Sequence, residues 1–373
     1  MKIIEVKSKR DIKRFINFPL ELYKDSLYYV PMLQMDEKKI FQKNYVYNNT
    51  CETVFYLCVD DNDKVLGRIE GIIQKAANEK WNQKRVRFTR FDAINDQDVA
   101  NALFDAVTEW AKPFGIEEIV GPLGYSDLER EGLLIEGFDR IQTYEEQYNY
   151  EYYQHLIDNY GFKKDVDWLE YNLYCPKSVD PKVDALVERI QEKYSLRIYH
   201  PKNVRKFIKQ YRDEFFELID TTYNKIYGTV PFTEEMMQSS ISNFSLILRP
   251  QDITVIFNKE NKIVAFALMF PSISKVVTKY KGKIGLGFLI DFFKNKKNPE
   301  ILDLGLIGVL PEYANKGAIS IILQNLFHDL IEHPVKHIET NLMLEENHNI
   351  LNLMNNLEHD LVKRRRCYIK KIK

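Results

Sequence analysis

The sequence lacks the features that mark several classes of protein. Its 373 residues carry a formal net charge of −1, so bulk charge gives no reason to expect a nucleic-acid or membrane partner. No apolar run approaches the roughly 20 residues that a membrane-spanning helix needs, and the first residues contain no apolar signal-peptide core. We therefore expect a cytoplasmic protein.

Cysteine and metal-binding patterns are equally sparse. The chain has 4 cysteines, and they are scattered without the spacing of metal ligands. Scattered cysteines fit a reducing compartment. His333 and His337 are four residues apart, but Pro334 interrupts any helix that would align their imidazoles. We expect no metal site.

The apolar patterns predict the same order of elements twice: a helix, a hairpin, a strand–loop–helix–strand unit, a helix and a final strand. In the first half these are predicted at residues 11–23, 54–73, 85–94, 99–111, 116–120, 152–159 and 168–174. In the second half they are predicted at residues 204–223, 253–270, 301–310, 319–332, 336–344, 347–357 and 361–372. Tyr171 and Tyr368 fall at equivalent places, 197 residues apart (368 − 171). We interpret this pattern as a duplication.

The predicted fold class is therefore α/β (α+β), with two domains that each have a mixed central sheet flanked by helices. We place the domains at residues 1–178 and 179–373, because residues 176–181 form a proline-containing linker.

One stretch carries most of the chemical information. Residues 301–310 are an apolar run of strand length, Pro311 ends that run, and a helix with one apolar face follows. Between Ala314 and Gly317 there is no acidic residue, and Lys316 adds a cation. The free amides and the dipole of such a helix start favour a phosphate group. The alternative is an ordinary strand-to-helix connection.

This loop, Val309-Leu310-Pro311-Glu312-Tyr313 followed by Gly317, resembles the acetyl-coenzyme A loop of the GNAT acetyltransferase superfamily. The resemblance implies a tandem GNAT-like protein that uses acetyl-coenzyme A, or another acyl-coenzyme A, with its pyrophosphate on the loop amides. Two positions depart from the family pattern: Ala314 replaces a basic residue or Gln, and Ile319 replaces a second small residue. The residues implied in coenzyme binding are Val309, Leu310, Tyr313, Ala314, Asn315, Lys316, Gly317, Ala318 and Asn347.

The resemblance also implies direct transfer of an acyl group from a thioester to a small-molecule amine. Glu312 is the candidate base, with a solvated carboxylate as the alternative. Asn347 stands where GNAT domains often carry an Asn near the pantetheine arm, and a helix N-cap is the alternative. The family often has a Tyr seven residues later as the thiolate acid. Met354 stands there, so Tyr368 becomes the candidate acid, with a core tyrosine as the alternative.

The corresponding first-half loop, residues 95–98, has no Gly, and its Asp96 and Asp98 would cap the helix and repel a pyrophosphate. We therefore expect the coenzyme in the second half only. The first half is interpreted as a degenerate copy, kept for structure or for binding the acceptor. Residues 121–139 form a long loop on the expected acceptor side, where an ordered structural loop is the alternative. Its residues suited to a cationic amine are Tyr125, Asp127, Glu131, Glu136 and Asp139.

Two further segments have simple interpretations. The basic run at residues 363–366 indicates a solvated edge, with contact to the nucleotide phosphate of coenzyme A as the alternative. Residues 288–294 form an amphipathic helix, for which a lid or a packed interface is favoured over membrane contact.

The sequence thus predicts an acyl-coenzyme A N-acyltransferase, with no nucleic-acid or membrane partner and with a homo-oligomer left open. The alternatives are a non-catalytic small-molecule or acyl-coenzyme A binding protein on the same fold, and a tandem-GNAT aminoacyl transferase.

Overall fold

The first half of the chain supplies seven strands and five α-helices to the structure, a computed structural model that describes residues 1–354 and 357–372. Its strands are β1 (Lys2–Glu5), β2 (Cys51–Val59), β3 (Val65–Gln74), β4 (Arg85–Ala93), β5 (Glu118–Gly121), β6 (Leu133–Glu136) and β7 (Lys163–Leu173). Its helices are α1 (Lys9–Leu22), α2 (Gln34–Lys39), α3 (Lys75–Lys80), α4 (Gln97–Ala111) and α5 (Tyr153–Tyr160).

The second half repeats this series and adds helices. Its strands are β8 (Arg197–Tyr199), β9 (Ile253–Phe257), β10 (Ile263–Pro271), β11 (Ile301–Val309), β12 (His337–Thr340), β13 (Met343–Leu344) and β14 (His359–Lys371). Its helices are α6 (Pro181–Tyr194), α7 (Val204–Tyr223), α8 (Glu234–Ile247), α9 (Ser274–Lys279), α10 (Leu286–Lys297), α11 (Pro311–Ala314), α12 (Ala318–Glu332) and α13 (His348–Met354). Residues 355 and 356 of the helix expected at 347–357 lie outside the described residues.

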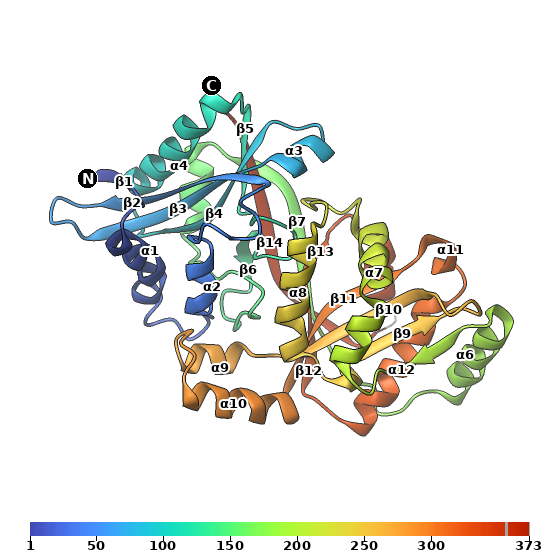
Figure 1. Ribbon diagram of the computed structural model, residues 1–373. Helices are drawn as coiled ribbons and strands as arrows, with labels where there is room; N and C mark the ends of the chain where they lie inside the picture. The colour runs from blue at the N-terminus through green and yellow to red at the C-terminus, as the bar shows by residue number, and fades with distance from the viewer. Residues whose placement is uncertain (355–356, 373) are drawn as a thin grey trace.

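The described strands form one continuous mixed sheet (Figure 1). Its main path runs β1-β2-β3-β4-β5-β14-β7-β12-β11-β10-β9-β8, with β6 added beside β14 and β13 beside β7. The order is symmetric about its centre, because β1 to β5 of the first half correspond to β8 to β12 of the second. The α/β class with a mixed central sheet and flanking helices is confirmed.

The two central strands are exchanged between the halves. β14, the last strand of the chain, lies between β5 and β7 of the first half, while β7 lies between β14 and β12 of the second half. Each half therefore receives one core strand from the other, and the two sheets become one. The limits at residues 1–178 and 179–373 stay a prediction.

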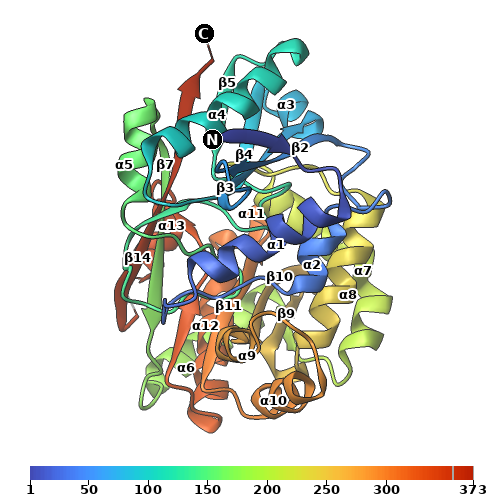
Figure 2. The ribbon, with the colours of Figure 1, turned by 90° about the vertical axis from the view of Figure 1, so that its left-hand side faces the viewer.

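Helices cover both faces of the sheet, as Figure 2 shows from the side. In the second half, Phe266 and Leu268 of β10 pack with α7 and α8, whereas Ala265 and Ala267 pack with α12. Alternate residues of a strand point to opposite faces, so one all-apolar strand serves two helical layers. In the first half α1 and α4 stand on opposite faces in the same way.

Candidate functional site

The strands β11 and β12 run in parallel but then separate. They pair from Ile301 opposite His337 to Leu304 opposite Thr340. Because β11 continues to Val309, its edge toward β12 has no strand partner beyond Leu304 in the described part of the chain. An open strand edge of this kind offers backbone N–H and C=O groups to a ligand.

Tyr223, the last residue of α7, occupies part of that open edge. Its hydroxyl accepts from the Ile307 N–H at 3.1 Å and donates to the Ile307 carbonyl at 2.8 Å. Burial raises the pKa of Tyr223 above its usual range; the hydrogen bond with Ile307 lowers it, and the nearby Asp127 carboxyl raises it. The hydroxyl is therefore neutral, and an acid of the first half, Asp127, lies close enough to this second-half tyrosine to affect its pKa.

The first half has an equivalent arrangement. The parallel pairing of β4 and β5 extends from Arg85 opposite Glu118 to Arg87 opposite Val120, and β4 continues to Ala93. Two tyrosine hydroxyls satisfy the last residue of this strand. Tyr153 accepts from the Ala93 N–H at 2.9 Å, and Tyr152 donates to the Ala93 carbonyl at 2.6 Å. Both halves thus close their open strand edge with tyrosines.

The helix starts that follow these strands differ in charge. Asp96 caps α4 of the first half, because its carboxylate accepts from the N–H groups of Asp98 at 2.9 Å and Val99 at 3.3 Å. In the second half Gly317 is the N-cap of α12, with φ of 75°, and no side chain among the described residues accepts from the first turn of that helix. An anion at this second helix start meets free amides instead of a carboxylate.

The loop before α12 is partly enclosed. Lys316 places its ammonium 4.3 Å from the centroid of the Tyr313 ring, and Asn258 donates to the Tyr313 hydroxyl at 3.2 Å. A Cβ added at Gly317 would lie 2.9 Å from the Ile190 side chain of α6. Helix α6 therefore covers one side of this loop, and that side is not open to a ligand.

The candidate acid and base lie in different halves of the structure. Glu312 is exposed on α11, whereas Tyr368 is 2% exposed on β14, opposite Gly121 of β5. Exchange of β14 places Tyr368 in the first-half core, where burial raises its pKa to about 12. Asn347 directly precedes α13, and its carbonyl accepts from the Leu351 N–H at 3.0 Å. The structure does not bring Glu312 and Tyr368 together.

The acidic loop at residues 121–139 divides between two environments. Tyr125 is buried and its hydroxyl donates to Glu70 in the first half. Glu131 is also buried, one of its carboxylate oxygens has no hydrogen-bond partner in the described structure, and a Cβ added at Gly228 would lie 3.3 Å from it. Burial, followed by the neighbouring Asp127, raises the pKa of Glu131 well above its usual range.

The remaining two acids of this loop point elsewhere. Glu136 and Asp139 are exposed, and Glu136 forms an ion pair with Arg364 at 3.3 Å. The structure therefore gathers Asp127 and Glu131 toward the second half and leaves Glu136 and Asp139 at the surface.

The first half contains a polar cleft that was not predicted from the sequence. It encloses about 750 Å³, counting its open mouth, and lies between α1, the segment leading into α2, β3, β4 and residues 129–130. Arg90, at a bulge of β4 with φ of 46°, lines it together with Asp92 and Arg130. A non-glycine residue with positive φ is uncommon and often marks a functional position. The sequence signal that could have indicated this cleft is the presence of charged residues inside otherwise apolar strands.

Buried ion pairs form the floor of this cleft. Arg90 donates to Glu37 at 2.9 Å and to Glu70 at 2.8 Å. Arg68 donates to Asp92 at 2.7 Å and also contacts Glu37. Burial raises the pKa of Glu70 to about 7 against the pull of Arg90, so this carboxyl titrates near neutral pH.

A second, entirely apolar pocket lies in the second half between α7 and α8, reaching β9 and β10. It encloses about 460 Å³, counting its mouth. Leu268 lines it, and this residue pairs with Leu306, the neighbour of Ile307 on the open strand edge.

Two known proteins resemble this chain over three quarters of its length or more. Protein YghO of Escherichia coli is 25% identical over 374 residues, which covers 98% of this chain and 94% of that protein. A bacterial ceramide synthase of Caulobacter vibrioides is 22% identical over 286 residues, 76% of this chain and 73% of that protein. No protein-family model matches.

Similarity to solved structures identifies the fold. A tandem GNAT protein from the clavulanic acid biosynthesis pathway superposes with a TM-score of 0.56 at 11% identity, covering 100% of this chain and 98% of that one. The chain has the tandem GNAT fold. A GCN5-related N-acetyltransferase from Sphaerobacter thermophilus agrees, with a TM-score of 0.55 at 10% identity over 100% of this chain and 96% of its own. The expected tandem GNAT architecture is thus confirmed as a fold.

Among the described residues, no helix is long and apolar enough to cross a membrane. No group of three or more His, Cys, Asp or Glu side chains in the described part is arranged to hold a metal ion.

Proposed function

We propose that the second half binds an acyl-coenzyme A and transfers its acyl group to an amine. The observation that carries this proposal is the contrast between the two helix starts. The N-terminus of α12 is uncapped and follows a diverging strand, whereas Asp96 blocks the equivalent position of α4. Coenzyme phosphates at residues 313–318 would meet free amides, the helix dipole and the Lys316 ammonium.

The thioester belongs at the open edge of β11 in this proposal. The N–H of Ile307 is the backbone donor suited to the thioester carbonyl. The hydrogen bond from this N–H to the Tyr223 hydroxyl must break when the substrate binds. Attack by a neutral amine forms the new C–N bond. The C–S bond then breaks, and the proton lost by the amine ends on the thiolate sulfur or on a base.

The apolar pocket between α7 and α8 supports an acyl chain longer than acetyl. It lies beside Leu268, which pairs with Leu306 next to the proposed thioester position. The exposed surface of this pocket is apolar, so an aliphatic chain that enters it would desolvate no polar group. We therefore extend the coenzyme proposal from acetyl-coenzyme A to longer acyl-coenzyme A.

The acceptor side is supported by Asp127 and Glu131, the two acids that approach Tyr223 and Gly228. A buried carboxyl pair suits a cationic or amine-bearing acceptor. Ceramides are amides of long-chain amino alcohols, so the resemblance to a ceramide synthase places amphiphilic amines first in any screen.

Calorimetric titration with acyl-coenzyme A of increasing chain length tests the proposal. Lys316→Glu should weaken binding about tenfold by placing an anion beside the phosphates. Gly317→Asp should abolish binding. Because Ile190 lies against that position, a thermal-unfolding measurement should show whether this variant is still folded. Lys259→Glu, the same charge change at an exposed lysine, is the matched control. Equal affinity in all forms would overturn the proposal, whereas binding without thiol release across the amine screen would favour a non-catalytic binding protein.

The cleft of the first half supports a second candidate function, the binding of a small polar molecule. Its lining combines two arginines, Arg90 and Arg130, with apolar side chains, a mixture typical of small-molecule sites. A thermal-shift screen of small carboxylic acids and phosphates, with Arg130→Gln as the variant, tests this function. A stabilising ligand that loses its effect in the variant would support it, and no stabilising ligand would count against it.

A further inference from the structure

Helix α10 carries apolar side chains on two opposite faces. Phe288 and Phe292 are 4% and 5% exposed, and they pack into a cluster with α9 and with Val30 of the first half. A second stripe points away from the protein. It comprises Leu286, Leu289, Ile290 and Phe293, which are 78%, 40%, 61% and 55% exposed. Their spacing of three and four residues places them on one side of the helix.

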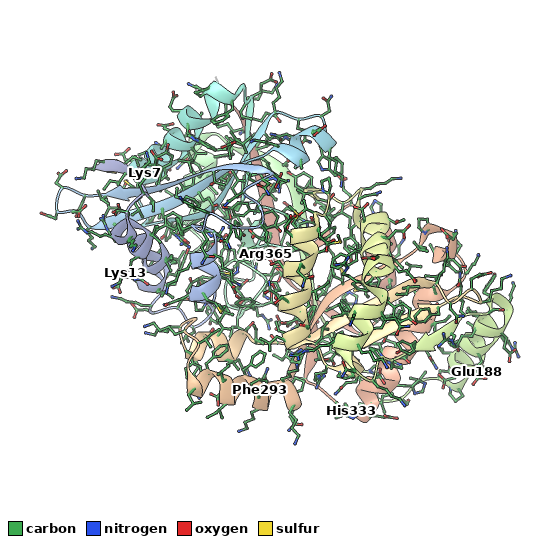
Figure 3. The ribbon with its side chains drawn as sticks, viewed as in Figure 1. Lys7, Lys13, Glu188, Phe293, His333 and Arg365 are labelled. Atoms are coloured by element: carbon green, nitrogen blue, oxygen red, sulfur yellow. The ribbon has the colours of Figure 1, made fainter. Side chains whose placement is uncertain are left out.

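The α9–α10 pair lies at the lower left of the molecule in Figure 1, and Figure 3 labels Phe293 on this helix. Ile284, just before the helix, is 45% exposed, and Leu246 of α8 is 52% exposed. Leu246 adjoins the end of α10, because its carbonyl accepts from the Lys296 ammonium at 2.5 Å. Ile284 and Leu246 therefore add exposed apolar side chains near the two ends of α10.

Lysines surround this stripe. Residues 281–297 contain five lysines and a single acid, Asp291, which is already bound by Lys279 at 2.6 Å and by Tyr280 at 2.9 Å. Lys294 follows Ile290 by one helical turn and Lys297 follows Phe293 by one turn, so both cations flank the stripe. The exposed lysines of this segment are Lys281, Lys283, Lys294 and Lys297.

We propose that α10 docks this protein on the surface of an anionic lipid bilayer. An apolar stripe bordered by lysines is the pattern of a helix that lies in the membrane interface, with its cations among the headgroups. The net charge of −1 gives no general attraction to anions, so the attraction must come from this local cluster. This inference revises the sequence-based preference for a lid or packed interface, because packing uses only the Phe288 and Phe292 face.

A second copy of the chain fits this surface less well. A two-fold interface through α10 would bring the same patch of both copies together. The lysine clusters at residues 281–283 and 294–297 would then come together in both copies, and Asp291, the single acid of this segment, is already bound by Lys279. Anionic headgroups, in contrast, neutralise those lysines while the stripe enters the acyl region.

The position of α10 connects docking to the first-half cleft. The turn before the helix is bound to the segment leading into α2, where the Gln34 N–H donates to the Gly282 carbonyl at 2.9 Å. Pro31, Met32 and Gln34 of that segment line the cleft. A bilayer under α10 would therefore lie next to one wall of this cleft.

Flotation with vesicles tests the proposal on the full-length protein. Wild type should float with phosphatidylcholine vesicles that contain phosphatidylglycerol and should not float with phosphatidylcholine alone. The double variants Ile290→Ser with Phe293→Ser, and Lys294→Glu with Lys297→Glu, should each lower binding about tenfold or more. All four side chains are exposed, so circular dichroism and thermal unfolding should match wild type.

Matched controls separate this patch from general effects. Val183→Ser with Leu186→Ser removes two exposed apolar side chains from α6, and Lys7→Glu with Lys13→Glu makes the same charge change near β1 and α1 (Figure 3). Both controls should bind anionic vesicles like wild type. The proposal is overturned if no form binds, or if the α10 variants bind as well as wild type. It is also overturned if light scattering shows a dimer that Ile290→Ser with Phe293→Ser dissociates, since the stripe then joins two copies.

Discussion

Trp168 and Arg365 face each other in register on the neighbouring antiparallel strands β7 and β14, and they occupy equivalent places in the two halves (365 − 168 = 197). The same shift maps one further pair of these strands onto another. Tyr171 opposite Leu361 corresponds to Tyr368 opposite Lys164, because 171 + 197 = 368 and 164 + 197 = 361. A pseudo-two-fold axis therefore passes between Trp168 and Arg365. The structural repeat expected from Tyr171 and Tyr368 is present in this register, and the duplication that would explain it stays an interpretation.

Burial makes the exchanged strands essential to both halves. Arg365 is 0% exposed at the centre of the molecule (Figure 3), where it donates to Glu170, Gln142 and the Gln147 carbonyl. Two of these partners, Gln142 and Gln147, come from the long connection of the first half. Arg365 of the last strand thus binds and positions a segment that lies more than 200 residues earlier in the chain.

Deleting residues 359–373 should therefore prevent cooperative folding of the first half as well as the second. The deletion removes the strand between β5 and β7 and leaves Glu170 and Glu146 buried without Arg365, a loss that exceeds the roughly 5–15 kcal/mol that stabilises a whole domain. Near-ultraviolet circular dichroism and urea unfolding measure the effect. Deleting residues 1–5, which removes the edge strand β1, is the control and should cost far less. An unchanged urea midpoint in the long deletion would contradict the exchange.

The order of elements was predictable from apolar periodicity, and the exchange was not. The pattern of 361–372 is the same whether the strand pairs within its own half or crosses to the other. Helix α8 was missed because it buries only Met236 and contains several serines. Helix α6 was missed for a similar reason, since Val187 is its one buried residue.

The site was predictable where its signal is local. The uncapped Gly317 and the capping Asp96 follow from the order of residues in their own loops. Tyr223 could not be found, because its contact with Ile307 joins residues 84 apart that share no pattern. Tyr368 was assigned to the second half from its place in the chain, and strand exchange moved it into the other core.

Stability should fall as the pH rises from about 5 through about 7. Burial raises the folded-state pKa of Glu70 to about 7 from a usual value of 4.5, so the folded protein binds a proton that the unfolded chain releases in this range. Stability is then greatest below the unfolded pKa and decreases through the folded pKa, by about 1–3 kcal/mol for this group. Urea unfolding at several pH values measures the slope. Glu70→Gln should flatten it, while the exposed control Glu79→Gln should leave it unchanged.

Tyr223→Phe should destabilise the free protein and increase its stabilisation by acyl-coenzyme A. Loss of the hydroxyl leaves the N–H and C=O of Ile307 without their partner, at a cost of about 1–3 kcal/mol. A thioester bound at this edge restores the hydrogen bond. Thermal unfolding with and without ligand measures both effects, and Tyr199→Phe on β8 is the control. If ligand stabilises the variant no more than wild type, the thioester does not use the Ile307 amide.

Glu131→Gln should weaken use of a cationic amine and spare both the fold and coenzyme binding. The carboxyl is 4% exposed and one of its oxygens has no hydrogen-bond partner among the described residues. Its pKa is raised well above the usual range by burial and by Asp127, which favours the neutral form in the free protein. Gln has nearly the same shape and is also neutral, and stability should therefore change little. An arriving ammonium group would favour ionisation of Glu131 and gain an ion pair, which Gln cannot supply.

The expected result is a KM for the amine that rises about tenfold in Glu131→Gln, with further loss when Asp127→Asn is added. Glu136→Gln, at an exposed acid of the same loop, is the control and should behave like wild type. Steady-state thiol release gives the KM for the amine, and calorimetry gives the affinity for acyl-coenzyme A. An unchanged KM in Glu131→Gln would show that the buried pair is structural, because the neutral acid then meets no cation during turnover.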